Sequence, residues 1–179
     1  MRKSMSWPIT GIAVICAAVA VIMPLSLMNK AKSVPAIHDI TTDMVNPPKF
    51  VAILPLRADA PNPAAYQGDE IAKQQLEAYP ELQTKTFAHT ADKVFAAALA
   101  TLGSMGLEVV AAEPTEGRIE AVHTTRWFGF KDDVVIRIQA EGQITLFDAR
   151  SKSRVGRSDV GKNAERLNDL IDGIESNLN

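Results

Sequence analysis

Cysteine is almost absent from this sequence, and its scarcity excludes several kinds of chemistry. The 179 residues contain one cysteine, Cys16, which lies inside the apolar N-terminal segment. The rest of the chain therefore offers no thiol nucleophile, no disulfide and no thiolate metal site. Several classes of enzyme are excluded on this ground alone.

The sequence also lacks a strong excess of charge of either sign. The formal net charge is -2 and the isoelectric point is about 5.9. Affinity for a phosphate backbone requires a strongly basic face. The composition therefore argues against a nucleic-acid partner, and any binding of anions has to be local.

Charge is missing altogether from one stretch, Ile9–Met28. About 20 apolar residues are enough to cross a bilayer as a helix. A cleaved signal peptide has a shorter apolar region of about 7–15 residues and a small-x-small cleavage site, which the sequence near Ala31 matches poorly. Pro24 supports the signal-peptide alternative, because a proline can end a helix. Residues 1–30 are therefore predicted to be an anchor in a bacterial inner membrane, or a signal segment, with the domain in the periplasm.

Proline is concentrated in the next segment, residues 31–83, where apolar runs are short. Its composition predicts an extended lead-in wrapped along the domain, with one short helix at Asp69–Ala78. Residues 84–179 then carry the periodic patterns of a folded domain. The seven prolines of the lead-in are Pro35, Pro47, Pro48, Pro55, Pro61, Pro63 and Pro80.

Two helical patterns enclose four strand-like runs in residues 84–179. Thr90 is predicted to be the N-cap of a helix that ends near Met105, and the last residues place Leu167, Leu170 and Ile174 on one apolar stripe. This α-β-β-β-β-α order predicts an α+β fold, a helix-grip-like antiparallel meander of four strands packed by two helices. The four runs are Leu107–Ala112, Gly117–Thr124, Val134–Ala140 and Gln143–Ala149.

The last two strands are predicted to pair through a two-residue turn at Glu141-Gly142, which places Ala140 opposite Gln143. Counting back pairs Ile136 with Phe147, Val134 with Ala149 and Asp133 with Arg150. One face then carries Val134, Ile136, Ile138 and Phe147, and the other carries Asp133, Arg137, Asp148 and Arg150 beside Val135 and Leu146. Two interpretations stay open. The charges form a lattice of ion pairs that fixes the register, or Arg137 and Arg150 line a ligand pocket held by Asp133 and Asp148.

A basic segment follows the hairpin and leads into the last helix. Gly156, Ser158, Asp159 and Gly161 predict a turn and caps, and free backbone N–H groups at a helix start form an anion site when cations are near. The alternative is a capped helix whose basic residues are solvated or paired with the sheet. Arg154, Arg157, Ser158 and Asn163 complete the candidate ligand-binding set. The basic residues of this region are Arg150, Lys152, Arg154, Arg157, Lys162 and Arg166, against the acids Asp148, Asp159 and Glu165.

Other chemistry is weakly supported. His38, Asp39 and Asp43 are spaced so that they could approach a metal, but His89 and His123 lack ligand spacing. No nucleophile motif accompanies the serines among the basic residues, and the glycine spacing matches no nucleotide-binding loop. Three aromatic residues surround Gly129, and they close the core at a loop, form the apolar wall of a ligand site or touch the membrane interface. These three residues are Trp127, Phe128 and Phe130.

Several separate motifs resemble those of the family known as domain of unknown function 1499, over about residues 35–179. The resemblance implies a bacterial envelope or organellar protein with an N-terminal membrane segment, and it carries no catalytic residues. The motifs, in chain order, are Pro35-Ala-Ile-His-Asp-Ile-Thr-Thr-Asp43, Asn46-Pro-Pro48, Tyr79-Pro80, Gly117-Arg-Ile-Glu-Ala121, Gly129-Phe-Lys-Asp-Asp-Val134 and Arg150-Ser-Lys-Ser-Arg-Val-Gly-Arg-Ser-Asp-Val-Gly-Lys-Asn163.

Two functions from different classes remain. The first is a membrane-tethered binding or scaffolding module for an anionic ligand or an envelope protein, with no catalytic residue, metal or cofactor. The second is an envelope enzyme for an anionic or phosphorylated substrate, with Asp132 or Asp133 as base. An enzyme requires a concave site where an unpaired Asp and several Arg converge, whereas a module predicts paired charges or a flat patch. The cations assigned to the enzyme are Arg137, Arg150, Arg154 and Arg157.

Overall fold

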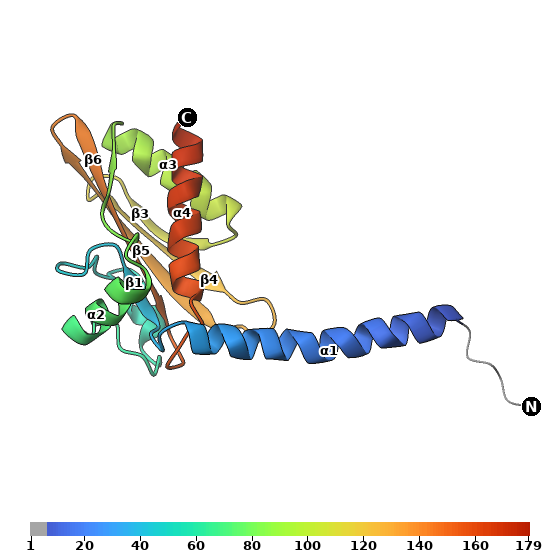
Figure 1. Cartoon of the computed structure of the whole chain (residues 1–179). Helices are drawn as coiled ribbons and strands as arrows, with labels where there is room; N and C mark the ends of the chain where they lie inside the picture. The colour runs from blue at the N-terminus through green and yellow to red at the C-terminus, as the bar shows by residue number, and fades with distance from the viewer. Residues whose placement is uncertain (1–6) are drawn as a thin grey trace, which may run out of the picture. The chain divides into compact units, whose positions relative to one another are not determined.

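The computed structural model describes residues 7–179 and divides the chain into two compact units, Met1–Val34 and Pro35–Asn179 (Figure 1). Residues 1–6, the start of the predicted anchor or signal segment, lie outside the described part. The first unit contains helix α1, Trp7–Ser33, and the helix continues through Pro24. Its stretch Ile9–Ser33 is long and apolar enough to cross a membrane, a test that a signal sequence also passes.

The second unit is an α+β domain built on an antiparallel sheet, which confirms the predicted class. The sheet has six strands rather than the four expected, in the order β1-β6-β5-β4-β3 with β2 also paired to β6. β1 and β2 are three residues each, too short to show a period of two in the sequence. The strands are β1 Asp39–Thr41, β2 Lys85–Phe87, β3 Glu108–Glu113, β4 Arg118–Thr124, β5 Lys131–Glu141 and β6 Ile144–Ser153.

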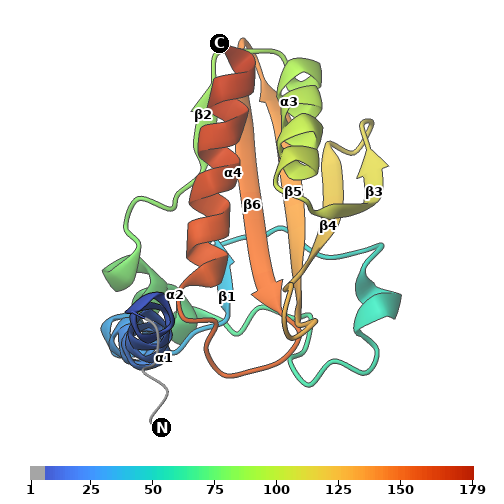
Figure 2. The ribbon, with the colours of Figure 1, turned by 90° about the vertical axis from the view of Figure 1, so that its right-hand side faces the viewer.

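Helices α3, Ala91–Ser104, and α4, Lys162–Leu178, cover one face of the sheet, which we call the helix face (Figures 1 and 2). The apolar stripe of α4 is fully buried there, as are the inward side chains of β5 and β6. Each fully buried Leu, Ile or Phe contributes about 1.5–3 kcal/mol. The centre of this core consists of Val94, Ala98, Leu102, Ile136, Phe147, Leu167, Leu170 and Ile174.

The β5–β6 hairpin turns one residue later than predicted. Glu141 pairs with Ile144, so Gly142 and Gln143 form the turn, and Gly142 has φ 62, as the first position of a type II′ turn favours. The predicted register was therefore wrong by two residues. A shift of two leaves every side chain on its predicted face, because the side-chain period of a strand is two.

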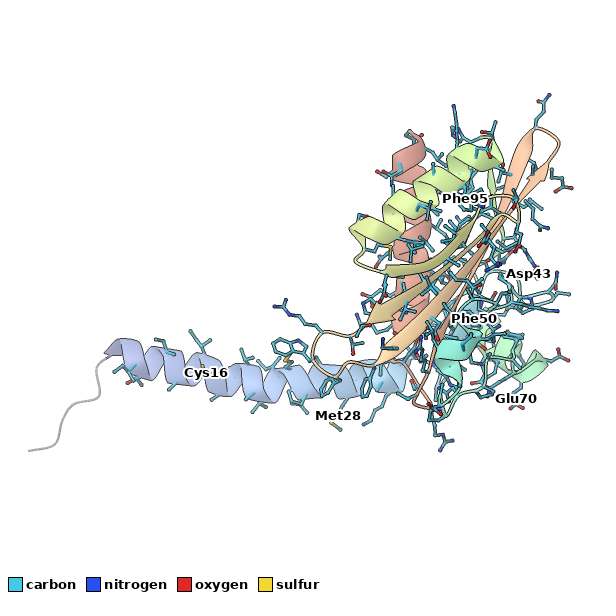
Figure 3. All side chains as sticks on the ribbon, turned by 180° about the vertical axis from the view of Figure 1, so that it is seen from behind. Cys16, Met28, Asp43, Phe50, Glu70 and Phe95 are labelled. Carbon is cyan, nitrogen blue, oxygen red and sulfur yellow. The ribbon has the colours of Figure 1, made fainter. Side chains whose placement is uncertain are left out.

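We call the opposite face of the sheet the loop face. It is covered by the segment that connects β1 to α2, and α2 is Asp69–Ala78. This segment contains a short 3₁₀ helix, Leu54–Arg57, and a small second core in which Phe50 and Ile53 pack on Val122 and Val135. Figure 3 shows Phe50 and Asp43 on the side of the sheet away from Phe95 of α3. The predicted short helix coincides with α2.

Candidate functional site

The sheet separates the eight predicted ligand-binding residues into two groups. Asp133, Arg137, Asp148 and Arg150 project from β5 and β6 on the loop face, and Arg154 joins Asp133 there. The other three lie beyond β6. Arg157 and Ser158 are in the connection to α4, and Asn163 is in the first turn of α4 under the helix face. The four residues of β5 and β6 were predicted to share a face, and they do.

Asp39 of β1 is the centre of a buried ion cluster on the loop face. Its two oxygens accept parallel hydrogen bonds from Arg150 Nε and Nη2, both 2.8 Å long, and one of them also accepts from Lys152 Nζ at 2.8 Å. The guanidinium of Arg150 also lies over the rings of Phe50 and Tyr66, at 5.0 and 5.5 Å. Burial lowers the pKa of Lys152, and the attraction of Asp39 offsets only part of that effect.

A second cluster surrounds Asp133, which is fully buried between two guanidinium groups. Arg57 of the 3₁₀ helix donates to Oδ2, and Arg154 donates to both oxygens, with Nη2 2.7 Å from Oδ1. Arg57 Nη2 also donates to the carbonyl of Asn62 at 2.9 Å. A carboxylate held in this way accepts charge-assisted hydrogen bonds on all sides and has no free path to a substrate.

Arg137 forms a third cluster nearer the surface. Its Nη2 donates to Asp43 and to Asp148, each at 2.8 Å, and Asp148 also accepts from the hydroxyl groups of Thr42 and Thr84. Burial alone raises the pKa of Asp43, but hydrogen bonds from the Asn46 and Val45 N–H groups and from Arg137 outweigh it, so the pKa is lowered.

Glu120 of β4 is not part of the Arg137 cluster. Its carboxylate accepts from the backbone N–H groups of residues 51, 52 and 53 at 2.9–3.1 Å and pairs with Arg118. It therefore satisfies the backbone donors of the turn that leads into the 3₁₀ helix. The loop face as a whole uses its charges to hold the lead-in against the sheet.

The predicted anion site at the start of α4 is occupied by a side chain of the protein. Asp159 accepts from the N–H groups of Gly161 and Asn163, and Ser158 Oγ accepts from the N–H of Val160. These backbone donors are therefore not open to an external anion. Burial raises the pKa of Asp159, although the two backbone hydrogen bonds partly oppose this. Val160 has φ 56, a strained conformation for a β-branched residue.

A buried polar network lies on the helix face beneath this turn, where side chains are otherwise apolar. Arg166 of α4 donates to Ser151 Oγ at 2.9 Å, to Asn163 Oδ1 and to Asp132 Oδ2 at 2.8 Å. Asn163 in turn donates to the carbonyl of His38 and to Ser153 Oγ. Polar groups buried in a core need such complete pairing, and strands β5 and β6 meet α4 here through hydrogen bonds.

A pocket of about 420 Å³ opens beside this network, between the end of β4 and α4; we call it the β4–α4 pocket. Met105 and Leu107 give it an apolar side. His123 and Asp132 line it together with Arg166, and further charged side chains stand around them. The remaining lining residues are Thr125, Arg126, Lys162, Glu165 and Asp169.

His123 has a defined protonation state in this pocket. Its Nδ1 lies 3.1 Å from Nη2 of Arg166, and a guanidinium can only donate, so Nδ1 is the acceptor. The proton of the neutral ring is then on Nε2, which has no protein partner among residues 7–179. Burial lowers the pKa of His123, the charge of Arg166 lowers it further, and Asp132 opposes them. The ring is therefore a neutral hydrogen-bond donor at pH 7.

Sequence reasoning missed the residues that complete these clusters. Asp39 was considered only as a metal ligand beside His38 and Asp43, whereas it binds Arg150 and Lys152. Among the described residues, no group of three or more His, Cys, Asp or Glu side chains could hold a metal ion. Arg57 carries no local signal, because its partner Asp133 is 76 positions away.

Comparison with known proteins identifies the family. The model of the family described as "Protein of unknown function (DUF1499)" matches residues 39–174, and the chain belongs to this family, which confirms the resemblance read from the motifs. No curated protein matches the sequence. Among solved structures, the domain is similar to CalU16 from Micromonospora echinospora, with a TM-score of 0.42 and 12% identity over 53% of this chain and 73% of that one.

Proposed function

We propose that this protein is a membrane-tethered binding module of the cell envelope. Helix α1 is its anchor in the inner membrane, and the domain that begins at Pro35 is periplasmic. The support for the anchor is the length and apolar composition of Ile9–Ser33. A module of this kind binds a ligand or an envelope protein and needs no catalytic group.

The ligand site that we propose is the β4–α4 pocket, and the ligand is a small anionic molecule with a short apolar part. The observation that carries this proposal is the fixed donor geometry of His123. Arg166 holds Nδ1, so Nε2–H remains available to donate to a ligand oxygen. Arg126 adds positive charge, since among the described residues it has no carboxylate partner, and Met105 and Leu107 suit an apolar group.

The loop face is a weaker candidate for the ligand, although five of the predicted site residues lie there. Arg150 and Asp133 are both buried, and their hydrogen-bonding capacity is used by protein groups. A ligand would have to displace these groups and leave a carboxylate unpaired at high cost. We assign these residues to holding the lead-in, which leaves the loops above them free to contact a protein partner.

A thermal-shift measurement tests the ligand proposal. The full chain is placed in nanodiscs of zwitterionic lipid and titrated with butyl phosphate and, separately, with inorganic phosphate. A saturable rise in Tm is expected, larger for butyl phosphate because its apolar part contacts Met105 and Leu107. Arg126→Ala and His123→Phe should remove the rise.

Lys49→Ala is the matched control, because Lys49 is an exposed cation that borders hollows on the loop face. It should leave the titration unchanged. A rise that survives Arg126→Ala, or that is lost equally in Lys49→Ala, would mean that the β4–α4 pocket is not the site.

An enzyme is the second candidate, and one observation favours it. Asp132 Oδ2 lies 4.0 Å from His123 Nδ1, and both residues border the β4–α4 pocket. Of the two carboxylates considered as a base, Asp132 therefore has access to a pocket and Asp133 has none. Turnover of a phosphate ester that is lost in a folded Asp132→Asn variant would favour the enzyme over the module.

A further inference from the structure

The loop between β4 and β5 exposes an aromatic cluster that contributes nothing to either core. Trp127 is 85% exposed, Phe128 76% and Phe130 52%. The rings of Phe128 and Phe130 stack with centroids 5.6 Å apart, and the guanidinium of Arg126 lies 5.7 Å from the ring centre of Trp127. Single exposed apolar residues are ordinary, but a contiguous cluster of aromatic rings indicates an interaction surface.

Two neighbouring segments extend this apolar surface. Leu56, at 51% exposed, and Val155, at 38%, line one hollow of about 270 Å³ together with Gly129 and Lys131. The apolar side chains therefore come from three separate parts of the chain that meet at one end of the sheet. We call this surface the aromatic end; it consists of Leu56, Trp127, Phe128, Phe130 and Val155.

The aromatic end lies where the chain enters the domain from the apolar helix. The carbonyl of His38 accepts from the N–H of Ser153, and the N–H of Arg154 donates to the carbonyl of Lys131. His38 and Lys131 thus flank the end of β6 on its two sides, about two strand spacings or ~10 Å apart. Only Val34 separates the last residue of α1 from Pro35, the first residue of the domain.

The exposed charges of the same three segments are mostly positive. Three exposed cations stand there against one exposed carboxylate, Asp59. Anionic lipid surfaces attract such clusters, and aromatic side chains settle at the level of the headgroups. The three cations are Arg126, Lys131 and Arg157.

We propose that the aromatic end docks on the surface of the membrane that holds α1, with its aromatic rings among the headgroups and its cations against anionic lipid. This inference rests on the membrane anchoring proposed above and adds a second, interfacial contact to it. The domain is then held with one end of its sheet on the bilayer. The β5–β6 turn lies at the other end of the sheet (Figure 2), so this docking directs it away from the membrane.

Two labelling positions test this proposal in the full chain. In a Cys16→Ser background, Phe128→Cys places an environment-sensitive fluorophore in the aromatic end, and Gln143→Cys places the same fluorophore in the β5–β6 turn. The 11 residues of β5 separate the two positions by about 35 Å. Both proteins are reconstituted in nanodiscs that contain anionic lipid.

The label at position 128 should show blue-shifted emission, at least about twofold stronger quenching by a nitroxide-bearing lipid than the label at 143, and protection from aqueous iodide. Replacing Arg126 and Lys131 by Gln, or using zwitterionic lipid alone, should weaken all three effects. The label at position 143 should respond to iodide and not to the lipid nitroxide.

Three results would overturn the proposal. If the protein co-elutes with nanodiscs while both labels report water, the anchor holds and docking fails. If the label at 128 is shielded from iodide but not quenched by the lipid nitroxide, the surface binds protein. If the protein does not co-elute with nanodiscs and position 128 reports water, both the anchor and the docking are wrong.

Discussion

The two faces of the sheet are stabilised by different forces. The helix face is held by apolar side chains from elements that follow one another in the chain. The loop face is held by ion pairs between β5 or β6 and a lead-in that lies as much as 113 residues away in sequence, which is the separation of Lys152 from Asp39. The difference shows that the loop face is assembled by contacts between distant residues, which no local sequence pattern predicts.

Removing Asp39 should cause the largest loss of stability on the loop face. Asp39→Ala leaves Arg150 and Lys152 buried without a counter-charge, and Lys152 is fully buried. Breaking a buried ion cluster from one side costs about 3–5 kcal/mol. Guanidinium unfolding of the full chain in a mild detergent measures this loss.

A triple variant separates charge from packing at this position. Asp39→Ala combined with Arg150→Met and Lys152→Met removes the stranded charges and should recover much of the lost stability. A loss below about 1 kcal/mol in the single variant would mean that water reaches the cluster, and that the two faces differ less than the burial indicates.

On the helix face, Leu170→Ala should cost about 2–5 kcal/mol by creating a cavity under α4. Leu170 is fully buried, whereas Leu76 on α2 is 49% exposed. Leu76→Ala is therefore the matched control and should change the free energy of unfolding by about 0.5 kcal/mol or less. Similar losses in both variants would show that the helix face is not the tightly packed half.

The helix face could be predicted because its signals are local. The period of Leu167, Leu170 and Ile174 marks one side of a helix, and the alternation at Ile136 and Ile138 marks one side of a strand. The same alternation put the charges of β5 and β6 on the correct opposite face, even though the turn at Gly142 was misplaced. A shift of two residues changes partners without changing faces.

For the loop face, the charges of the hairpin could be predicted, but their partners in the lead-in could not. Arg137 and Asp148 were placed together because they belong to one hairpin, but Asp43, Asp39 and Arg57 are distant in sequence. Secondary-structure propensity does not predict which acidic residue of a proline-rich segment will pair with a given arginine. The β4–α4 pocket could not be predicted for the same reason, because His123 and Arg166 are 43 residues apart in sequence.

The Asp43–Arg137 pair should show a smaller and pH-dependent contribution. Both side chains are about one-fifth exposed, so Asp43→Asn should cost about 1 kcal/mol at pH 7. The pKa of Asp43 is lowered in the folded state, so its contribution is present above the unfolded value of 3.8 and lost as the pH falls through the folded value.

Melting curves of wild type and Asp43→Asn at pH 7 and pH 3 measure that dependence. The difference in Tm should shrink at pH 3. Asp59→Asn is the control, because Asp59 is exposed, and it should give no difference at either pH. A gap between wild type and Asp43→Asn that is equal at both pH values would mean that the effect of the substitution does not come from the charge of Asp43.

The smallest effect should come from His123, where the apolar helix face changes into a polar pocket. Because its pKa is lowered in the folded state, the unfolded chain takes up a proton first as the pH falls below 6.5, and stability decreases in that window. NMR of ring-labelled histidine should give a midpoint below 6.5. Arg166→Gln removes the cation that holds Nδ1 and should move that midpoint up. A midpoint at or above 6.5 in the wild type would mean that the attraction of Asp132 outweighs the effects of burial and of Arg166.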